Sequence, residues 1–282
     1  MILAAGLGTR LRPYTNTTPK ALLTVGEKTM LQIVSEKLID AGVSDIVVNV
    51  HHHAEQMKSA IHNLQHPGIR FHISDETDLL LDTGGGIKKA RHLLDGNQAF
   101  LVYNIDILCD IDLKMMLTTH TNSGALATLA VSNREASRYF LWKQGLLYGW
   151  QHTETGETIL CHKKGVVKEN MHSRHQKDNT KSRPGSPSDE HPATINDEEQ
   201  PETIQYQHYE ATFVKKAFSG IHILEPAIFD LIDETGVFSI KDVYLRLAGN
   251  HPITCFEHDH KTWIDIGTPE KLARARKSYN SK

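Results

Sequence analysis

The first residues of the chain that could do chemistry are two cations beside a loop with two glycines. Gly6 and Gly8 follow a short apolar run, and Arg10 and Lys20 come soon after them. Glycine lets backbone N–H groups approach a ligand closely because it has no Cβ. Phosphate oxygens are bound by such N–H groups together with fixed cations. The combination predicts a site for a nucleoside triphosphate, with Arg12 as a secondary contact.

The loop matches neither of the two common phosphate-binding motifs. The spacing G-x-x-x-x-G-K-[ST] is absent, and the G-x-G at 6–8 is followed by Thr-Arg rather than by x-x-G. A nicotinamide dehydrogenase is disfavoured because an acidic residue after the second strand is missing as well. Taken alone, a Gly-x-Gly after a strand is more often a simple turn than a phosphate site.

Two aspartates are candidates for binding a metal ion. Asp106 follows an apolar run at 100–104, Asp265 lies near the end of the chain, and each has an isoleucine on both sides. A carboxylate in apolar surroundings is costly unless it is paired or bound to a metal, and Mg²⁺ prefers oxygen ligands. Spacing alone leaves open the alternative that each aspartate caps a helix or forms a turn.

The elements that must position these residues alternate between strand and helix in the first half of the chain. Apolar and β-branched runs predict strands at 2–5, 45–50, 70–73, 99–104 and 124–131. Helical spacing predicts helices at 31–41, 54–64 and 83–94. This alternation favours parallel strands with helices on both faces. Ligands of such sheets lie outside the carboxyl ends of the strands, where the Gly6 loop, His51 and Asp106 would meet.

The second half is interrupted by a segment of different composition. Further strands are predicted at 216–223, 252–256 and 263–266, and helices at 226–232, 240–248 and 268–279. Residues 168–205 contain no Phe, Tyr or Trp and have four of the ten prolines. Such a segment buries too little apolar surface to offset its ordering entropy. We expect a single domain over 1–282 with a disordered or flexible insertion at 168–205, a partner-binding segment being the alternative.

The overall composition excludes several classes of protein. The net charge is −3, which argues against general binding to nucleic acid. No apolar run approaches the ~18 residues of a membrane span, and no signal peptide is evident. Cys109, Cys161 and Cys255 are widely spaced, so neither a disulfide framework nor a zinc site is indicated. We expect a cytoplasmic enzyme without nucleic-acid or membrane partners.

The chain contains 18 histidines, including three adjacent ones at 51–53. Neighbouring side chains on extended backbone point in alternating directions, so these three would not converge on one ion. We expect them to line the rim of the cleft and assign no histidine to catalysis.

A longer string is far more specific than its glycines. Leu-Ala-Ala-Gly-x-Gly-Thr-Arg-Leu-x-Pro at 3–13, followed by Pro19 and Lys20, resembles the signature of the sugar-1-phosphate nucleotidyltransferases. Members of this family join a sugar 1-phosphate to a nucleoside triphosphate and release pyrophosphate. The resemblance implies an α/β fold, a Rossmann-like three-layer α/β/α domain with a mostly parallel central sheet. It extends over nearly the whole chain outside the insertion and implies a stand-alone catalytic domain.

The resemblance implies roles for the charged residues. Arg10 would bind the β- and γ-phosphates, and Lys20 would span the α-phosphate and the sugar phosphate. Asp106 and Asp265 would bind Mg²⁺, the second within a Trp-x-Asp-x-Gly-Thr context that this chain matches. The chain departs from the family at Ile105, where the family commonly has glycine, so a close approach of the ribose to this turn is not implied.

The resemblance also implies which residues contact the two substrates. Those expected to bind the nucleotide are Leu3, Ala4, Ala5, Gly6, Gly8, Thr9, Arg10, Thr83, Gly84 and Gly85. Those expected to bind the sugar are Asn104, Ser219 and Gly220. The three glycines at 84–86 could instead serve close packing at the start of a helix.

The implied reaction is an in-line displacement at the α-phosphate, in which catalysis is mainly alignment and charge neutralisation. Its substrates would be a nucleoside triphosphate and a sugar 1-phosphate, with Mg²⁺ as cofactor. UTP with an N-acetylated sugar 1-phosphate is our first expectation, and GTP with mannose 1-phosphate is the alternative. A non-catalytic nucleotide-sugar-binding regulator is less expected, because all four charged residues are present. We expect a monomer or a small homo-oligomer.

Overall fold

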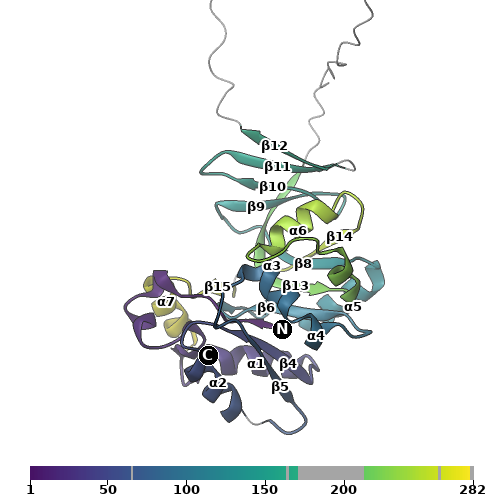
Figure 1. Ribbon diagram of the computed structural model, residues 1–282. Helices are drawn as coiled ribbons and strands as arrows, with labels where there is room; N and C mark the ends of the chain where they lie inside the picture. Colours follow the sequence, from purple (N-terminus) through teal and green to yellow (C-terminus); the bar gives the residue numbers. More distant parts are fainter. Residues whose placement is uncertain (65, 163–164, 171–212, 260–261, 280–282) are drawn as a thin grey trace, which may run out of the picture.

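The computed structural model describes residues 1–64, 66–162, 165–170, 213–259 and 262–279 (Figure 1). The insertion predicted at 168–205 begins inside a strand, β12 (Gly165–Asn170), and from residue 171 onward it lies outside the described residues. None of the helices in the described part of the chain is both long and apolar enough to cross a membrane.

The first half folds largely as its pattern predicts. Four parallel strands stand side by side in the order β6-β1-β4-β5. Their bounds are Ile2–Leu3 for β1, Asp45–Val50 for β4, Arg70–Asp75 for β5 and Phe100–Asn104 for β6. The connecting helices are α1 (Met30–Asp40), α2 (Ala54–Asn63), α3 (Asp82–Lys89) and α4 (Arg91–Leu94). The strands and the first two helices were expected within a few residues of their observed bounds, whereas α3 and α4 were expected as one helix at 83–94.

The second half makes the sheet mixed, so the expectation of a mostly parallel sheet was wrong. The long strand β13 (Val214–Leu224) runs antiparallel between β6 and β8 (Ala127–Ser132), and β14 (Ile253–Glu257) pairs parallel to β8. Beyond them, antiparallel hairpins extend the sheet. The added strands are β9 (Arg138–Lys143), β10 (Leu146–His152), β11 (Glu157–His162) and β12.

For the β9–β10 hairpin, the reason for the antiparallel pairing is the turn chemistry. Gln144 and Gly145 join β9 to β10, and both have positive φ, 52° and 77°. Positive φ at both central residues is what a two-residue hairpin turn of the primed type requires. A connection of two residues can join only antiparallel strands.

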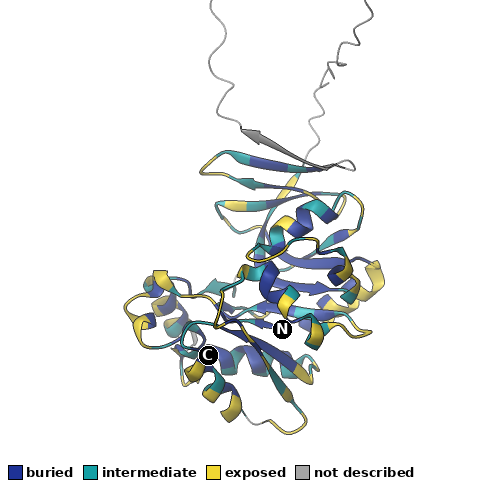
Figure 2. Ribbon diagram, in the orientation of Figure 1, coloured by how far each residue is buried: buried dark blue, intermediate teal, exposed yellow. Residues whose placement is uncertain are grey.

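Helices pack on both faces of the sheet. Side chains alternate along β4, so Ile46 and Val48 enter one apolar cluster while Val47 enters the other. The first cluster also contains side chains of α1, α2, α5 (Leu113–Ser123) and α7 (Pro269–Tyr279). The second contains side chains of α3, α6 (Ile240–Leu247) and a 3₁₀ helix at Pro226–Leu231. Figure 2 shows the buried residues concentrated on the sheet and the inner faces of these helices.

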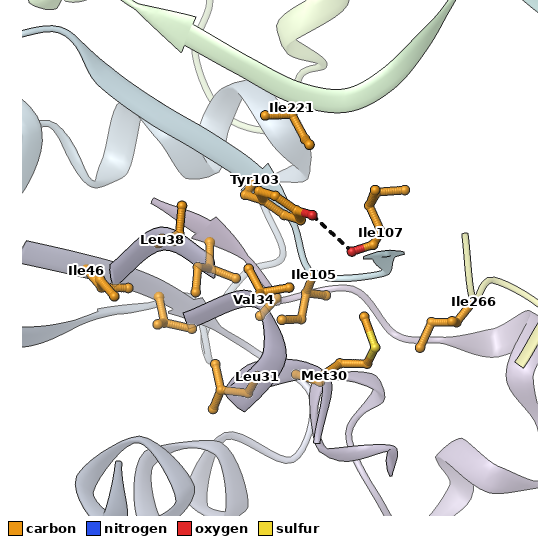
Figure 3. Packing of buried hydrophobic residues seen from close by; sticks show 14 of the residues in the cluster. Met30, Leu31, Val34, Leu38, Ile46, Tyr103, Ile105, Ile107, Ile221 and Ile266 are labelled. Atoms are coloured by element: carbon orange, nitrogen blue, oxygen red, sulfur yellow. Dashed lines mark hydrogen bonds between the residues drawn. The ribbon is translucent and has the colours of Figure 1, made fainter. Parts of the chain in front are cut away.

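The first cluster includes Ile105 and Ile107, in the segment that follows β6. Figure 3 shows Leu31, Val34 and Leu38 of α1 packed near Ile105 and Tyr103. The Tyr103 hydroxyl donates to the carbonyl oxygen of Ile107 at 3.2 Å. The chain segment around Asp106 is therefore anchored on both sides by buried apolar residues.

Short elements complete the fold around this edge. They are β2 (Thr24–Val25) paired with β3 (Lys28–Thr29), β7 (Ile107–Leu108) paired with β15 (Ile264–Asp265), and 3₁₀ helices at Thr9–Leu11, Tyr14–Asn16 and Lys20–Leu22. The β7–β15 pair ties the end of the chain to the segment after β6.

Candidate active site

A pocket of about 300 Å³ opens at the carboxyl ends of the parallel strands. Most of its lining residues follow β1, β4, β5 or β6, and one comes from the second half of the chain. The lining residues are Leu3, Ala4, Ala5, Gly6, Lys20, Asn49, Glu76, Leu80, Asp82, Thr83, Asn104, Ile105, Asp106 and Val237. Eight of the residues expected at the site from the sequence are in this set. Those outside it are Gly8, Thr9, Arg10, Gly84, Gly85, Ser219, Gly220 and Asp265.

The two aspartates are brought together although 159 positions of sequence separate them. Asp265 pairs with Ile107 across the β7–β15 ladder, and the N–H of Ile266 donates to the carbonyl oxygen of Asp106 at 2.9 Å. Lys20 Nζ lies 2.5 Å from Asp106 Oδ2. The site thus joins the charged residues of the first loop to both carboxylates.

Asp265 has a lysine partner that the sequence did not indicate. Lys271 Nζ, in the first turn of α7, lies 2.5 Å from Asp265 Oδ2, and the N–H of Gly267 donates to Asp265 Oδ1 at 3.1 Å. Burial opposes ionisation of Asp265, but these two bonds outweigh it and lower the pKa of the carboxyl. The ion pair was missed because Asp265 precedes the helix, so no helical spacing connects it to Lys271.

The two carboxylates are compatible with binding Mg²⁺, but they would fill only part of its six coordination positions. No group of three or more His, Cys, Asp or Glu side chains in the described part of the chain could hold a metal ion. Mg²⁺ is commonly bound by one or two protein carboxylates, with substrate phosphates and water completing its six positions. Asp106, in the turn just before β7, and Asp265, on the paired strand β15, fit that arrangement.

Arg10 lies beside the second carboxylate rather than in the pocket lining. A Cβ built on Gly267 would lie 2.8 Å from Asp265 Oδ1 and 3.3 Å from Arg10 Nη2. A side chain at 267 would therefore collide with the carboxylate and crowd the guanidinium. The loop that presents Arg10 is tightened by Gly8, whose φ of +63° favours glycine.

A second arginine, Arg134, was not expected from the sequence and is largely withdrawn from water. Its guanidinium stacks 3.9 Å from the ring centre of Trp263, and its Nη2 donates to the carbonyl oxygen of Phe218 at 2.6 Å. Its Nε–H is buried with no acceptor among the described residues. Burial lowers the pKa of Arg134, and the Asp265 charge partly opposes this. Arg134 follows β8 in a stretch without any motif, so no sequence pattern identified it.

The predicted sugar-contacting residues adjoin one another at an irregularity of β13. The β13–β8 register shifts between Phe218 and His222, and Gly220 has φ +80°. A Cβ on Gly220 would lie 3.1 Å from Asn104 Nδ2, so these two residues are in contact. The Ser219 side chain is buried, and its hydroxyl forms a hydrogen bond with His258 Nε2 at 2.8 Å. This hydroxyl therefore already has a partner within the protein. Sugar binding by these residues stays a prediction.

The three glycines at the start of α3 are needed for packing. The N–H groups of Gly84 and Gly85 both donate to the carbonyl oxygen of Phe238, at 3.0 and 3.2 Å. A Cβ on Gly84 would lie 2.5 Å from the Phe238 ring, and one on Gly86 would lie 2.7 Å from Glu76 Oε1. Two backbone donors expected to bind the nucleotide are therefore engaged within the protein, and their contact with a nucleotide stays a prediction.

A buried polar network connects three strand ends beneath the pocket. Asn49 Oδ1 accepts from the N–H groups of Ala4 and Ala5 at 2.6 and 3.3 Å, and Asn49 Nδ2 donates to Glu76 Oε1 at 2.8 Å. His51 Nδ1 lies 2.6 Å from the Glu76 carbonyl oxygen. Residues 51–53 are not among the described residues that line the pocket, so their expected place at its rim is not observed.

Similarity to known proteins agrees with this geometry. A family model described as Nucleotidyl transferase matches residues 1–145. A mannose-1-phosphate guanyltransferase of Yarrowia lipolytica is 28% identical over 274 residues, 96% of this chain and 61% of the relative. An N-acetylmuramate alpha-1-phosphate uridylyltransferase of Caulobacter vibrioides is 45% identical over 108 residues, 38% of this chain and 44% of the relative. The chain thus spans less than two thirds of the length of either relative.

Solved structures share the fold. HddC from Yersinia pseudotuberculosis, complexed with GMP-PN, matches with a TM-score of 0.63 at 20% identity, covering 99% of this chain and 97% of that one. A UDP-glucose pyrophosphorylase complexed with UDP-glucose matches with a TM-score of 0.65 at 18% identity and the same coverage. At these identities the likeness concerns the fold alone.

Proposed function

Because the chain belongs to the nucleotidyl transferase family, we propose that it transfers a nucleoside monophosphate from a nucleoside triphosphate to a sugar 1-phosphate. The observation that supports this most strongly is the meeting of Asp106 and Asp265 beside Lys20 and Arg10. Two carboxylates and two cations, two of them lining the pocket and two beside it, suit a reaction between two phosphorylated substrates.

The chemistry asked of these residues is charge neutralisation and alignment. An oxygen of the sugar phosphate attacks the α-phosphorus, the bond from the α-phosphorus to the α–β bridging oxygen breaks, and pyrophosphate leaves. Lys20, at the pocket wall, would hold the α-phosphate and the incoming phosphate close together. Arg10 would stabilise the negative charge that develops on the leaving pyrophosphate.

A divalent cation fits this proposal. Asp106 and Asp265 would hold Mg²⁺, which when bound neutralises charge on the triphosphate. Removing divalent cations with a chelator should therefore abolish turnover.

The base and the sugar are the finer part of the proposal. UTP with an N-acetylated sugar 1-phosphate is our first choice, supported by the 45% identity to the Caulobacter relative. GTP with mannose 1-phosphate is the second candidate, supported by the Yarrowia relative, which matches over 96% of this chain.

The test is a matrix of UTP and GTP against N-acetylated and unacetylated sugar 1-phosphates, with pyrophosphate release as the readout. We expect release that requires both substrates and is fastest with UTP and an N-acetylated sugar phosphate. A clear preference for GTP would overturn the choice of base and leave the reaction class standing. Nucleotide binding without turnover on any pair would favour a non-catalytic binding protein.

A further inference from the structure

One residue of the pocket comes from outside the region that the family model matches. Val237 lines the pocket and is 57% exposed. A single exposed apolar residue normally needs no explanation. This one lies on the wall of a concave site, where Leu80 also presents an apolar side chain. Apolar surface inside a pocket is what a flat, weakly polar ligand group requires.

The backbone around Val237 is fixed to the start of α3. The N–H of Phe238 donates to the carbonyl oxygen of Leu81 at 3.3 Å, and the Phe238 carbonyl oxygen accepts the two bonds from Gly84 and Gly85. The N–H of Ile240 donates to Thr83 Oγ1 at 3.0 Å. These bonds fix the chain on the C-terminal side of Val237. On its N-terminal side, Lys88 Nζ of α3 donates to the carbonyl oxygen of Glu234 at 2.7 Å. The segment that carries Val237 is therefore anchored to α3 rather than free.

The rest of the pocket indicates which part of a nucleotide would meet this wall. Lys20 is the cation among the lining residues, and it is bonded to Asp106. Two acidic lining residues adjoin Leu81, whose carbonyl oxygen is bonded to Phe238. Asp82 follows Leu81 in the chain, and Glu76 Oε2 accepts from the Leu81 N–H at 3.1 Å. A phosphate at this end of the pocket would be repelled by these carboxylates. A triphosphate therefore belongs at the Lys20 end, which leaves the base for the apolar wall.

We propose that Val237 and Leu80 form the wall against which the base of the nucleoside triphosphate packs. The inference deepens the proposed function and rests on it. It also changes the expected base site, which the sequence placed on the glycine backbone at 83–86. The second half of the chain then contributes directly to nucleotide affinity, and Val237 is a positioning residue rather than a catalytic one.

The test compares binding of nucleotides with binding of inorganic tripolyphosphate. Val237→Ala and Val237→Thr remove apolar surface without adding charge, and Val214→Ala, at a site 50% exposed on β13, is the matched control. Calorimetry should show UTP and GTP binding weakened about fivefold by both Val237 variants, as expected for losing the burial of part of one apolar side chain. Tripolyphosphate binding should be unchanged, because it has no base.

Enzyme kinetics give a second readout. The KM for the nucleotide should rise in the Val237 variants, while kcat and the KM for the sugar phosphate stay at the wild-type values. Unchanged nucleotide affinity in both variants, or an equal loss for tripolyphosphate, would overturn the assignment of Val237. A wild-type protein that binds nucleotide through Val237 but releases no pyrophosphate would overturn the proposed reaction and leave the base wall standing.

Discussion

At the level of single residues, each carboxylate of the candidate site is bonded to a lysine. Lys20 neutralises Asp106 and Lys271 neutralises Asp265, and the two aspartate side chains are only 21% and 18% exposed. Pairs with so little exposure are screened by water and salt less than surface pairs are. A phosphate bound beside Lys20 would share its three N–H donors with Asp106. In the proposed reaction, positive charge for the phosphates would therefore already be in place beside Asp106.

The carboxylates themselves can be tested by removing only their charge. Asp106→Asn and Asp265→Asn should each lower kcat on the order of a hundredfold or more at saturating Mg²⁺, as for other electrostatic groups. The fold should be kept, because the amide has the size of the carboxyl group. The melting temperature should fall modestly, since each change leaves a lysine without its partner charge. The control is Asp230→Asn, an aspartate whose side chain is 73% exposed. Near-normal turnover in either site variant would contradict the metal assignment.

Lys20 and Arg10 should differ in which step they affect. Lys20→Ala should lower kcat more than nucleotide affinity, because its proposed contact with both phosphates strengthens in the transition state. Arg10→Ala should also weaken binding of the triphosphate, since its proposed contacts are the β- and γ-phosphates. Equilibrium binding and kcat, measured on both variants, separate the two effects. Equal loss of nucleotide affinity in both would disprove this division.

The structure brings the charged residues named from the sequence close together, but it adds neighbours that the sequence did not indicate. Arg10, Lys20 and Asp106 stand in motifs, whereas Arg134 contacts Phe218 and Trp263, which are distant in sequence. Sequence spacing cannot predict such contacts, because they depend on how β8 and β13 come together. Lys271 is close to Asp265 in sequence, but the turn before α7 removes the helical spacing that would have indicated the pair. The resemblance to the family suggested that the backbone at 83–86 contacts the base. In the structure, the N–H groups of Gly84 and Gly85 are bonded to the carbonyl oxygen of Phe238.

At the level of elements, the start of α3 shows how glycines can be required by packing. Replacing glycine by alanine inside a helix normally stabilises it by about 1 kcal/mol. At Gly84 the new methyl group would lie 2.5 Å from the Phe238 ring and 2.9 Å from the Ile240 nitrogen, and at Gly86 it would lie 2.7 Å from Glu76 Oε1.

We therefore expect Gly84→Ala and Gly86→Ala to lower the free energy of unfolding by about 1–3 kcal/mol, as overpacking does. Gly96→Ala, where no atom lies within 4 Å of the new methyl group, should change it by less than about 0.5 kcal/mol. Urea denaturation of the three variants measures the difference. If the Gly84 and Gly86 variants were as stable as Gly96→Ala, the segment around Phe238 would have to shift at little cost in free energy.

The elements predicted correctly are those with strong periodicity. β4 and α1 were expected almost at their observed bounds, since a β-branched run and a helical spacing are local signals. The hairpins β9–β12 were missed, because Gln144-Gly145 is a weaker turn pattern than Asn-Gly. This omission contributed to the wrong prediction of a mostly parallel sheet, because the hairpin strands β9–β12 pair with one another antiparallel.

For the whole molecule, the buried His222 makes stability depend on pH. His222 is 1% exposed, bonded to the Tyr244 hydroxyl, and burial lowers its pKa to about 3. In the unfolded chain its pKa returns to about 6.5. Between these values the unfolded state binds the extra proton, so the free energy of unfolding falls as the pH is lowered through this window.

Urea titrations between pH 7 and pH 4 measure this contribution. The slope from one fully linked histidine is about 1.4 kcal/mol per pH unit. His222→Gln, which keeps a hydrogen-bonding side chain but cannot titrate, should lose that part of the slope while the contributions of other groups remain. Identical slopes in wild type and variant would show that His222 does not drive the acid sensitivity.

As a whole, the molecule is proposed to join two phosphorylated substrates. An experiment that follows the transferred group supplies a nucleoside triphosphate labelled at the α-phosphate together with a sugar 1-phosphate and Mg²⁺. We predict that the label enters a nucleotide sugar in an amount equal to the pyrophosphate released, and that omitting the sugar phosphate stops both. Label remaining in nucleoside di- or monophosphate, with no nucleotide sugar formed from any sugar 1-phosphate, would contradict the account.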